Sequence, residues 1–191
     1  MINSVSGYSS IIYDPLSWIE QSHFTLPNRF NNIRCIRIIN DILIDSFNLS
    51  TNTYNVSADS LAAVFIHHWF NLPQIAFLMA CQRHRAQLAL NAKMTRLPSS
   101  VQRFMKLRIV SSGAGEWTGN LNIADLYSRS FNELQPFLVA LPVELAERVP
   151  LLFPKNEHDQ WQSDLSNDLL IFKLAIQHVK TYPFRISKLC P

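Results

Sequence analysis

Glycine is scarce in this sequence: there are four residues in 191, and three of them fall between Gly113 and Gly119. A β-rich fold needs glycine at its turns, and a phosphate-binding loop needs it where the backbone meets the ligand. The glycine stretch also lacks the strand–loop–helix context of such a loop. The scarcity therefore counts against a β-rich fold and against a glycine-rich phosphate site.

Charged residues are also few: Asp, Glu, Lys and Arg make up 16% of the chain, against about 25% in a typical soluble domain. Two explanations fit this low charged content: a surface that binds other proteins, or a large apolar core. The hydrophobic content of 48% excludes intrinsic disorder as the main state. The length suits one helical domain, residues 1–191, that needs neither disulfide nor metal to fold.

The three cysteines Cys35, Cys81 and Cys190 are odd in number and far apart, and no pair has the spacing of metal ligands. We expect reduced thiols that serve as small apolar residues in a cytosolic chain. His84 lies three residues after Cys81, but two ligands do not make a structural zinc site. The sequence therefore predicts no metal site and no cofactor.

Catalytic motifs are absent as well. The nucleophile pattern G-x-S-x-G does not occur, and Ser111-Ser112-Gly113 does not replace it. We therefore predict a protein that is not an enzyme and has no catalytic residues. An all-α enzyme stays open as an alternative, and its sign would be a pocket in which polar groups converge on His68 or His84.

The sequence shows no targeting or membrane-spanning segment. The first ten residues, MINSVSGYSS, have neither the basic start nor the apolar stretch of a secretory signal. No apolar run approaches the ~20 residues that cross a bilayer. We expect any association with a membrane to go through a partner protein.

Helical periodicity is what the sequence has in abundance, and it predicts an all-α fold, a compact and irregular multi-helix domain. The Ser-Ser-Gly-Ala-Gly cluster marks one exception near 107–121, a loop or a small hairpin, and 150–154 is expected to be extended. Ser57 and Asn122 are expected to cap the helices that follow them. We expect a short turn or helix at about 14–21, and helices at about 27–49, 58–69, 73–92, 98–108, 123–131, 143–149 and 159–181.

Two of these predicted helices differ in character. The helix at 27–49 is amphipathic, with a core face and a solvent face. Its core face comprises Phe30, Ile33, Ile36, Ile39, Ile42, Leu43 and Phe47, and its solvent face comprises Arg34, Arg37, Asn40, Asp41 and Asp45. The helix that Pro73 opens is apolar on every side from Ile75 to Cys81, which predicts a buried central helix. Its end, Arg83-His84-Arg85, is expected to emerge into solvent or onto a partner.

Charge is distributed unevenly along the chain. No Asp or Glu occurs between Ser60 and Gly115, whereas from Asn120 to Leu170 eight acids face three bases. One interpretation is a basic face that docks an acidic partner and an acidic face that docks a basic one. The other is that the two segments pack together and neutralise each other inside the protein. Both interpretations stay open at this point.

The acid-free interval supplies the candidate partner-binding residues. They are Arg83, Arg85, Arg96, Arg103 and Lys106, joined by Trp117 from the glycine-bearing loop. Trp117 is an interface anchor if it is exposed, and a plug for its own loop if it is not. Charge reversal at Arg83 and Arg85 is expected to weaken a protein partner and leave the fold intact. An RNA-binding module is the further alternative, although Phe104 is the only aromatic between Arg83 and Arg108 and the net charge is only +3.

Four blocks, in order along the chain, carry a resemblance to a known family. They are Ile11-Ile12-Tyr13-Asp14-Pro15-Leu16-Ser17-Trp18-Ile19; Leu72-Pro73-Gln74-Ile75-Ala76 with Cys81, Arg85 and Leu88-Ala89; Leu145-Ala146-Glu147-Arg148-Val149-Pro150-Leu151-Leu152-Phe153-Pro154; and Leu174-Ala175-Ile176-Gln177 with Tyr182-Pro183. Together they resemble the SctK/OrgA/MxiK family of bacterial type III secretion accessory proteins, and the OrgA branch most. The resemblance runs from Ile11 to Pro183, with poor agreement over Arg29–Val56 and Leu107–Ala124.

The resemblance implies a non-enzymatic scaffold of the sorting platform. Such a protein links the cytosolic domain of the SctD-type inner-membrane ring protein to the SctQ-type pod protein, with the SctL-type stator as a further partner. It is expected in the bacterial cytoplasm, at the cytoplasmic face of the inner membrane, where it supports effector secretion. The family assigns no binding residues to this chain, so the candidate residues above rest on charge alone.

Overall fold

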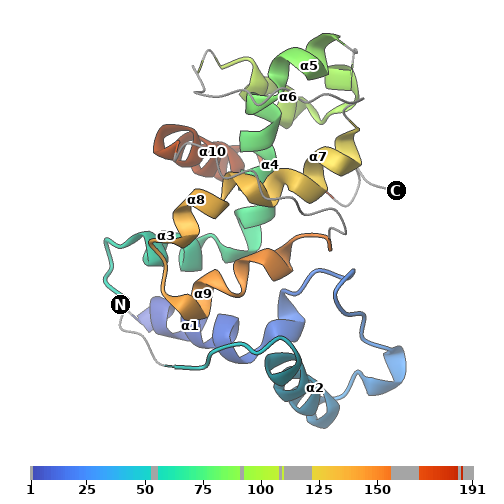
Figure 1. Cartoon of the computed structure of the whole chain (residues 1–191), viewed down its shortest axis with the longest axis vertical. Coiled ribbons are helices and arrows are strands. Elements are labelled where there is room, and N and C mark those ends of the chain that lie inside the picture. Colours follow the sequence, from blue (N-terminus) through green and yellow to red (C-terminus); the bar gives the residue numbers. More distant parts are fainter. Residues whose placement is uncertain are drawn as a thin grey trace. The chain divides into compact units, whose positions relative to one another are not determined.

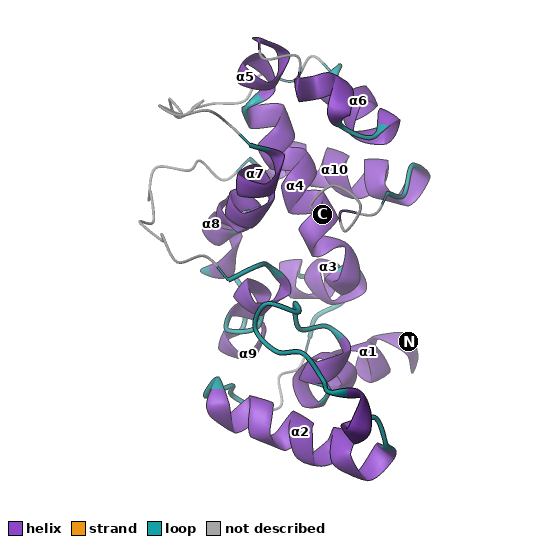
Figure 2. Ribbon diagram, turned by 90° about the vertical axis from the view of Figure 1, so that its right-hand side faces the viewer, coloured by secondary structure: helices purple, strands orange, loops and turns teal. Residues whose placement is uncertain are grey.

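The computed structural model describes residues 2–52, 56–90, 93–107, 109, 122–155, 168–184 and 186 (Figure 1). Every regular element in these ranges is an α-helix or a 3-10 helix, and none is a strand (Figure 2). The prediction of an all-α fold is confirmed. The predicted loop or hairpin at 107–121 lies outside the described residues, except for Leu107 and Ile109.

Contacts between Cα atoms divide the chain into two compact units. Unit 1 comprises Met1–Phe70 and Leu138–Lys155, and unit 2 comprises Asn71–Phe137 and Asn156–Pro191. Each unit thus joins two stretches that are far apart in the sequence. The single domain over 1–191 stays a prediction, since two compact units are compatible with one domain or with two.

Unit 1 is built around the apolar side of its first helix. Its elements are α1 (Ile2–Tyr13), η1 (Pro15–Ser17), η2 (Asn28–Phe30), α2 (Ile33–Ser46), α3 (Leu61–His67), α9 (Val143–Ala146) and η6 (Val149–Leu152). α1 packs on α2 and α3, and its Ile11 and Ile12 are buried. Trp18 packs edge-on against Trp69 with ring centroids 5.5 Å apart, and its indole N–H donates to the Ile11 carbonyl at 3.1 Å.

Two expectations for unit 1 are wrong and a third is confirmed in part. Of the turn or helix expected at 14–21, Pro15–Ser17 forms the 3-10 helix η1, which follows α1. α2 begins at Ile33 because the Asn32 side chain caps it, accepting from the Cys35 N–H at 3.0 Å. Residues 150–154 are not extended throughout, because η6 continues to Leu152.

The N-cap of α3 also differs from the expectation. Ser60, not Ser57, accepts a hydrogen bond from the Ala63 N–H at 3.2 Å. The Ser60 hydroxyl donates in turn to the Ser57 carbonyl at 2.6 Å. The earlier serine therefore supports the cap and does not form it.

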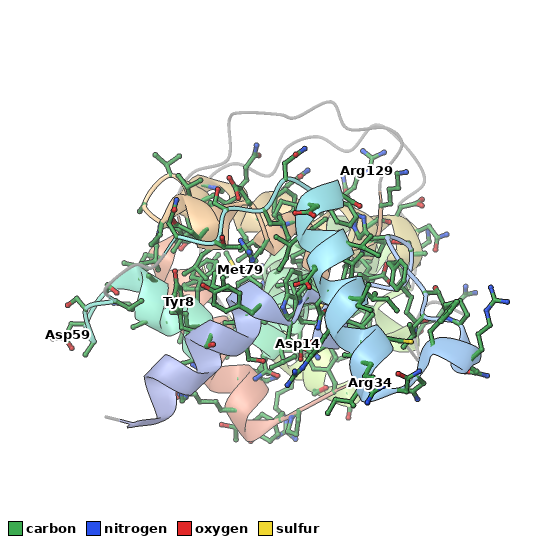
Figure 3. All side chains as sticks on the ribbon, turned by 90° about the horizontal axis from the view of Figure 1, so that it is seen from below. Tyr8, Asp14, Arg34, Asp59, Met79 and Arg129 are labelled. Atoms are coloured by element: carbon green, nitrogen blue, oxygen red, sulfur yellow. The ribbon has the colours of Figure 1, made fainter. Side chains whose placement is uncertain are left out.

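α2 turns a different face to the core than its periodicity predicts. Ile33 and Ile42, expected in the core, are exposed, whereas Asn40, expected in solvent, is buried. The Asn40 side chain accepts from the Leu16 N–H at 2.9 Å and donates to an Asp14 carboxylate oxygen at 2.7 Å. Asp14 accordingly lies beside α2 (Figure 3). These two hydrogen bonds satisfy the buried amide of Asn40 and so allow the Asn40 side of α2 to face the core.

Unit 2 surrounds α4 (Leu72–Arg83), which packs against its neighbours on several sides. Its other elements are α5 (Arg85–Leu90), η4 (Lys93–Arg96), α6 (Ser99–Met105), α7 (Ile123–Arg129), η5 (Ser130–Glu133) and α10 (Leu169–Thr181); η3 (Trp69–Asn71) and α8 (Gln135–Leu138) cross the sequence boundaries between units. Both views show α4 between α7 and α10 (Figures 1 and 2). Every residue from Ile75 to Arg83 is buried, so the predicted central helix is confirmed.

In unit 2, capping side chains set where two of the other helices begin. The helix expected at 73–92 breaks at His84, which leaves the α-helical conformation before α5 begins. Asn122 caps α7 as expected, accepting from the Ala124 N–H. Asp168 caps α10, and its carboxylate accepts from the Ile171 N–H at 3.0 Å. The start that we expected for the last helix, near residue 159, lies outside the described residues, because these leave out 156–167.

No single helix in the described part of the chain is long and apolar enough to cross a membrane. α3 and the stretch Trp69–Arg83 reach the required length and composition only together, as a bent pair.

Candidate partner-binding surface

The first candidate residue, Arg83, lies inside unit 2 and not on its surface. It ends α4 with 7% of its area exposed, and its guanidinium forms a two-pronged ion pair with Glu133 of η5. Nε donates to Oε1 at 2.6 Å and Nη2 donates to Oε2 at 2.8 Å. These hydrogen bonds raise the pKa of Arg83 and keep it charged. The expectation that Arg83 emerges into solvent is therefore wrong.

This pair answers one question that the charge pattern left open. Glu133 belongs to the acid-rich segment and Arg83 to the acid-free one, so at this point the two segments neutralise each other internally. Charge reversal at Arg83 would place two carboxylates together in the core. Against the expectation from the sequence, we therefore predict that such a variant loses stability.

The groups beside this pair are electrically neutral. Burial lowers the pKa of His84 and raises the pKa of the Cys81 thiol, so that both are uncharged near neutral pH. No three His, Cys, Asp or Glu side chains among the described residues gather closely enough to hold a metal ion. The α4–α5 break therefore presents neither a charged nucleophile nor a set of ligands.

Arg85 is exposed and is held against the C-terminal end of α6. Its Nη1 donates to the Leu107 carbonyl at 3.2 Å and lies 3.5 Å from the Met105 carbonyl. The last carbonyls of a helix lack partners within the helix and carry partial negative charge. The Leu107 carbonyl, two residues past the end of α6, also accepts from the Gln82 side chain at 2.9 Å, so Arg85 adds a further donor there and keeps its own charge at the surface.

Arg103 and Lys106 lie at the same end of α6 and are exposed. The Arg103 guanidinium covers the ring of Tyr182 with its carbon 4.5 Å from the ring centre. His178 of α10 also meets the Ser100 carbonyl at 2.8 Å, which fastens α10 to α6. Arg103 is thus oriented by a cation–π contact.

We call Arg85, Arg103 and Lys106 the basic surface. None of the three forms an ion pair with a carboxylate among the described residues, in contrast to Arg83. Arg96 of η4 is exposed too, and η4 packs on α5, the helix that Arg85 begins. Trp117 lies outside the described residues. The structure thus gathers three of the six candidates at one place.

Sequence reasoning missed a second arginine, Arg148, which is 0% exposed in unit 1. Its Nη1 donates to the carbonyls of Ser50 at 2.9 Å and Glu144 at 2.8 Å, and its Nη2 donates to the Ile12 carbonyl at 3.0 Å. The neighbouring Glu147 accepts from the N–H and the hydroxyl of Ser50 at 2.8 and 3.1 Å. The only signal in the sequence was the apolar flank of Leu145 and Val149, both of which are buried.

Arg148 has a structural consequence for the blocks that carry the family resemblance. Ile12 belongs to the first block and Arg148 to the third, and the arginine joins them directly. The Leu151 carbonyl of the third block likewise accepts from the Glu20 N–H at 2.9 Å. Two of the blocks that carry the family resemblance are therefore in direct contact within unit 1.

Comparison with known proteins agrees with these blocks. The model of the family described as "Bacterial type III secretion apparatus protein (OrgA_MxiK)" matches residues 8–181. The oxygen-regulated invasion protein OrgA of Salmonella typhimurium is 28% identical over 177 residues, which cover 92% of this chain and 88% of OrgA. Protein MxiK of Shigella flexneri is 30% identical over 79 residues, which cover 41% of this chain and 44% of MxiK. No solved structure matches the chain.

The matched region takes in residues from both units and almost all of the described helices. The chain belongs to the OrgA_MxiK family of bacterial type III secretion apparatus proteins.

Proposed function

We propose that this chain is a non-enzymatic adaptor of the type III secretion sorting platform. It links the cytosolic domain of the SctD-type inner-membrane ring protein to the SctQ-type pod protein, close to the SctL-type stator, and so supports effector secretion. It acts in the bacterial cytoplasm and meets the inner membrane only through the ring.

The observation that carries the proposal, beside family membership, is the basic surface. Arg85 and Arg103 are held in place by a helix end and an aromatic ring, and no described carboxylate neutralises them. Ordered, unpaired charge of one sign selects a partner of the opposite sign and speeds encounter with it. In a chain with 16% charged residues, such a surface is a good candidate for the contact with an acidic face of the pod or ring protein.

The test is co-purification from the native bacterium with two matched charge-reversal variants. Arg103→Glu/Lys106→Glu changes the basic surface, and Lys173→Glu/Lys180→Glu makes the same change in charge at exposed positions of α10 in the same unit. Arg85 is left intact because it also supports the end of α6. We expect the wild type and the α10 variant to recover the pod and ring proteins, and the α6 variant to lose one of them.

Two results would contradict the proposal at different levels. Equal recovery by both variants would show that the basic surface is not the contact. Recovery of neither the pod nor the ring protein by the wild type would exclude the adaptor role itself. Circular dichroism of each purified variant separates loss of a contact from loss of the fold.

A further inference from the structure

The outer face of α2 exposes apolar side chains that stay exposed among the described residues. Ile38 is 58% exposed and Ile42 is 54% exposed, and the two lie one helical turn apart. In Figures 1 and 2, the other labelled elements of unit 1 lie on one side of α2 only. The two side chains together form a small contiguous apolar patch on the helix surface.

The charges around these isoleucines are sorted by sign along the helix. Arg34 and Arg37 occupy the N-terminal half, and Asp41 and Asp45 occupy the C-terminal half, all of them exposed. Figure 3 shows Arg34 near one end of α2. None of the four forms an ion pair with another described side chain. The face is therefore basic at one end, apolar in the centre and acidic at the other end.

A face with this order is complementary to itself when two copies meet antiparallel. Arg34 then opposes Asp45 of the second copy, Arg37 opposes Asp41, and Ile38 opposes Ile42. The midpoints of these three pairings fall within one residue of one another, close to residue 39.5, so a single two-fold axis satisfies all of them. One patch used twice around such an axis is the geometry of an isologous dimer.

We propose that the outer face of α2 is a homodimer contact whose occupant is α2 of a second copy of this chain. Parallel pairing of the two helices would set like charges opposite each other, so the order of charges also selects the antiparallel arrangement. The proposal goes beyond the adaptor role and does not depend on it. Because the contact is one helix face, we expect a weak dimer, with a Kd in the roughly micromolar range or above.

The first test concerns the apolar centre. Sedimentation velocity of the full chain over a range of concentrations should show a monomer–dimer equilibrium. Ile38→Asp/Ile42→Asp should raise the dissociation constant at least about tenfold, because the variant buries two charges where the dimer buries two apolar side chains. Val139→Asp is the matched control: Val139 is 93% exposed, lies in unit 1 outside α2, and its substitution should leave the dissociation constant unchanged.

The second test uses the order of the charges. Arg34→Asp/Arg37→Asp makes the face wholly acidic, and Asp41→Arg/Asp45→Arg makes it wholly basic, so each variant alone should lose self-association. A mixture of the two should form heterodimers. The variant that carries all four substitutions reverses the order, is self-complementary again, and should recover the dimer.

A wild-type chain that stays monomeric at several hundred micromolar would overturn the proposal. So would a dimer that keeps its affinity in both double charge variants, because its contact would lie elsewhere. A monomeric wild type whose binding to another protein is lost with Arg34→Asp/Arg37→Asp would also overturn it and assign the face to that protein. These measurements use the purified chain alone, so their failure is distinct from failure of the adaptor proposal.

Discussion

Among the described residues, each unit buries an arginine, and the two guanidinium groups have different kinds of hydrogen-bond acceptor. In unit 2, Arg83 meets the carboxylate of Glu133 through two short hydrogen bonds. In unit 1, Arg148 meets three backbone carbonyls, and its Nε has no hydrogen-bond partner among the described atoms. Hydrogen bonds with Glu133 raise the pKa of Arg83, whereas burial lowers the pKa of Arg148. The same side chain is thus an ion-pair partner in one unit and a backbone cap in the other.

The difference shows what each arginine does for its unit. Ile12 lies in the last turn of α1, where carbonyls have no partner within the helix. Ser50 lies in the connector after α2, and Glu144 lies in α9. Arg148 therefore ties three separate backbone segments together, while Arg83 ties α4 to η5 through side chains alone. A side-chain partner can be exchanged by mutation, but a backbone partner cannot.

Arg148→Met should cause the largest loss. It leaves two buried carbonyls and the part-buried carbonyl of Ser50 without this donor, at about 1–3 kcal/mol each, so the free energy of unfolding should fall by about 5 kcal/mol. Chemical denaturation followed by circular dichroism measures it, and hydrogen exchange should rise in Met1–Phe70 and Leu138–Lys155. Lys155→Met removes an equal charge at an exposed site in the same unit and is the control. Equal stability of the two variants would refute the capping role.

Glu133→Leu should have the next largest effect, a loss of about 3–5 kcal/mol, because it removes the carboxylate that forms the two-pronged ion pair with the buried guanidinium of Arg83. Faster hydrogen exchange should appear in peptides of Asn71–Phe137 and not in those of unit 1, the reverse of the pattern for Arg148→Met. A uniform rise over both units would mean that the pair supports the whole chain and not unit 2 alone.

The double variant Arg83→Met/Glu133→Leu should be far milder, within about 1 kcal/mol of the wild type or more stable, because both buried charges leave together. A double-mutant cycle should then give a coupling free energy of roughly 3 kcal/mol between the two positions. No second substitution should rescue Arg148→Met in the same way, since its partners are main-chain atoms. A double variant as unstable as Glu133→Leu would remove the distinction between the two arginines.

The sequence alone predicts the centre of this fold better than its charged parts. The apolar run from Ile75 to Cys81 predicts a helix buried on all sides, and α4 is such a helix, because no rotation of an all-apolar helix exposes a polar face. Arg83 was misplaced because its partner Glu133 is 50 residues away. Only the fold decides whether that partner or solvent meets the guanidinium.

The amphipathic α2 was misread for a related reason. Seven apolar residues at helical spacing predict one core face, but the hydrogen bonds of Asn40 to Asp14 and Leu16 decide which side faces inward. The rotation brings Ile42 to the surface beside Ile38. Of the candidate site, the charge pattern picks out Arg85, Arg103 and Lys106, but their convergence on one end of α6 depends on contacts that no local pattern encodes.

The smallest predicted effect is a pH dependence that belongs to His84, next to Arg83. Burial is the main cause of its lowered pKa, and the charge of Arg83 acts in the same direction against that of Glu133. Below its ordinary pKa of 6.5, the unfolded chain therefore takes up the proton more readily than the folded protein. The free energy of unfolding should fall as the pH drops from 6.5 through the lowered pKa of His84 in the folded state. Below that pKa, His84 should make no further contribution to the pH dependence.

The measurement is the difference in the free energy of unfolding between the wild type and His84→Gln at several pH values. One site takes up at most one proton, so the difference should change by no more than about 1.4 kcal/mol per pH unit. The variant should lose stability less steeply on acidification, while Arg148→Met should keep the wild-type slope, because no histidine takes part in its contacts with Ile12, Ser50 and Glu144. A His84→Gln profile parallel to the wild type would show that the imidazole is as well hydrated in the folded protein as in the unfolded chain.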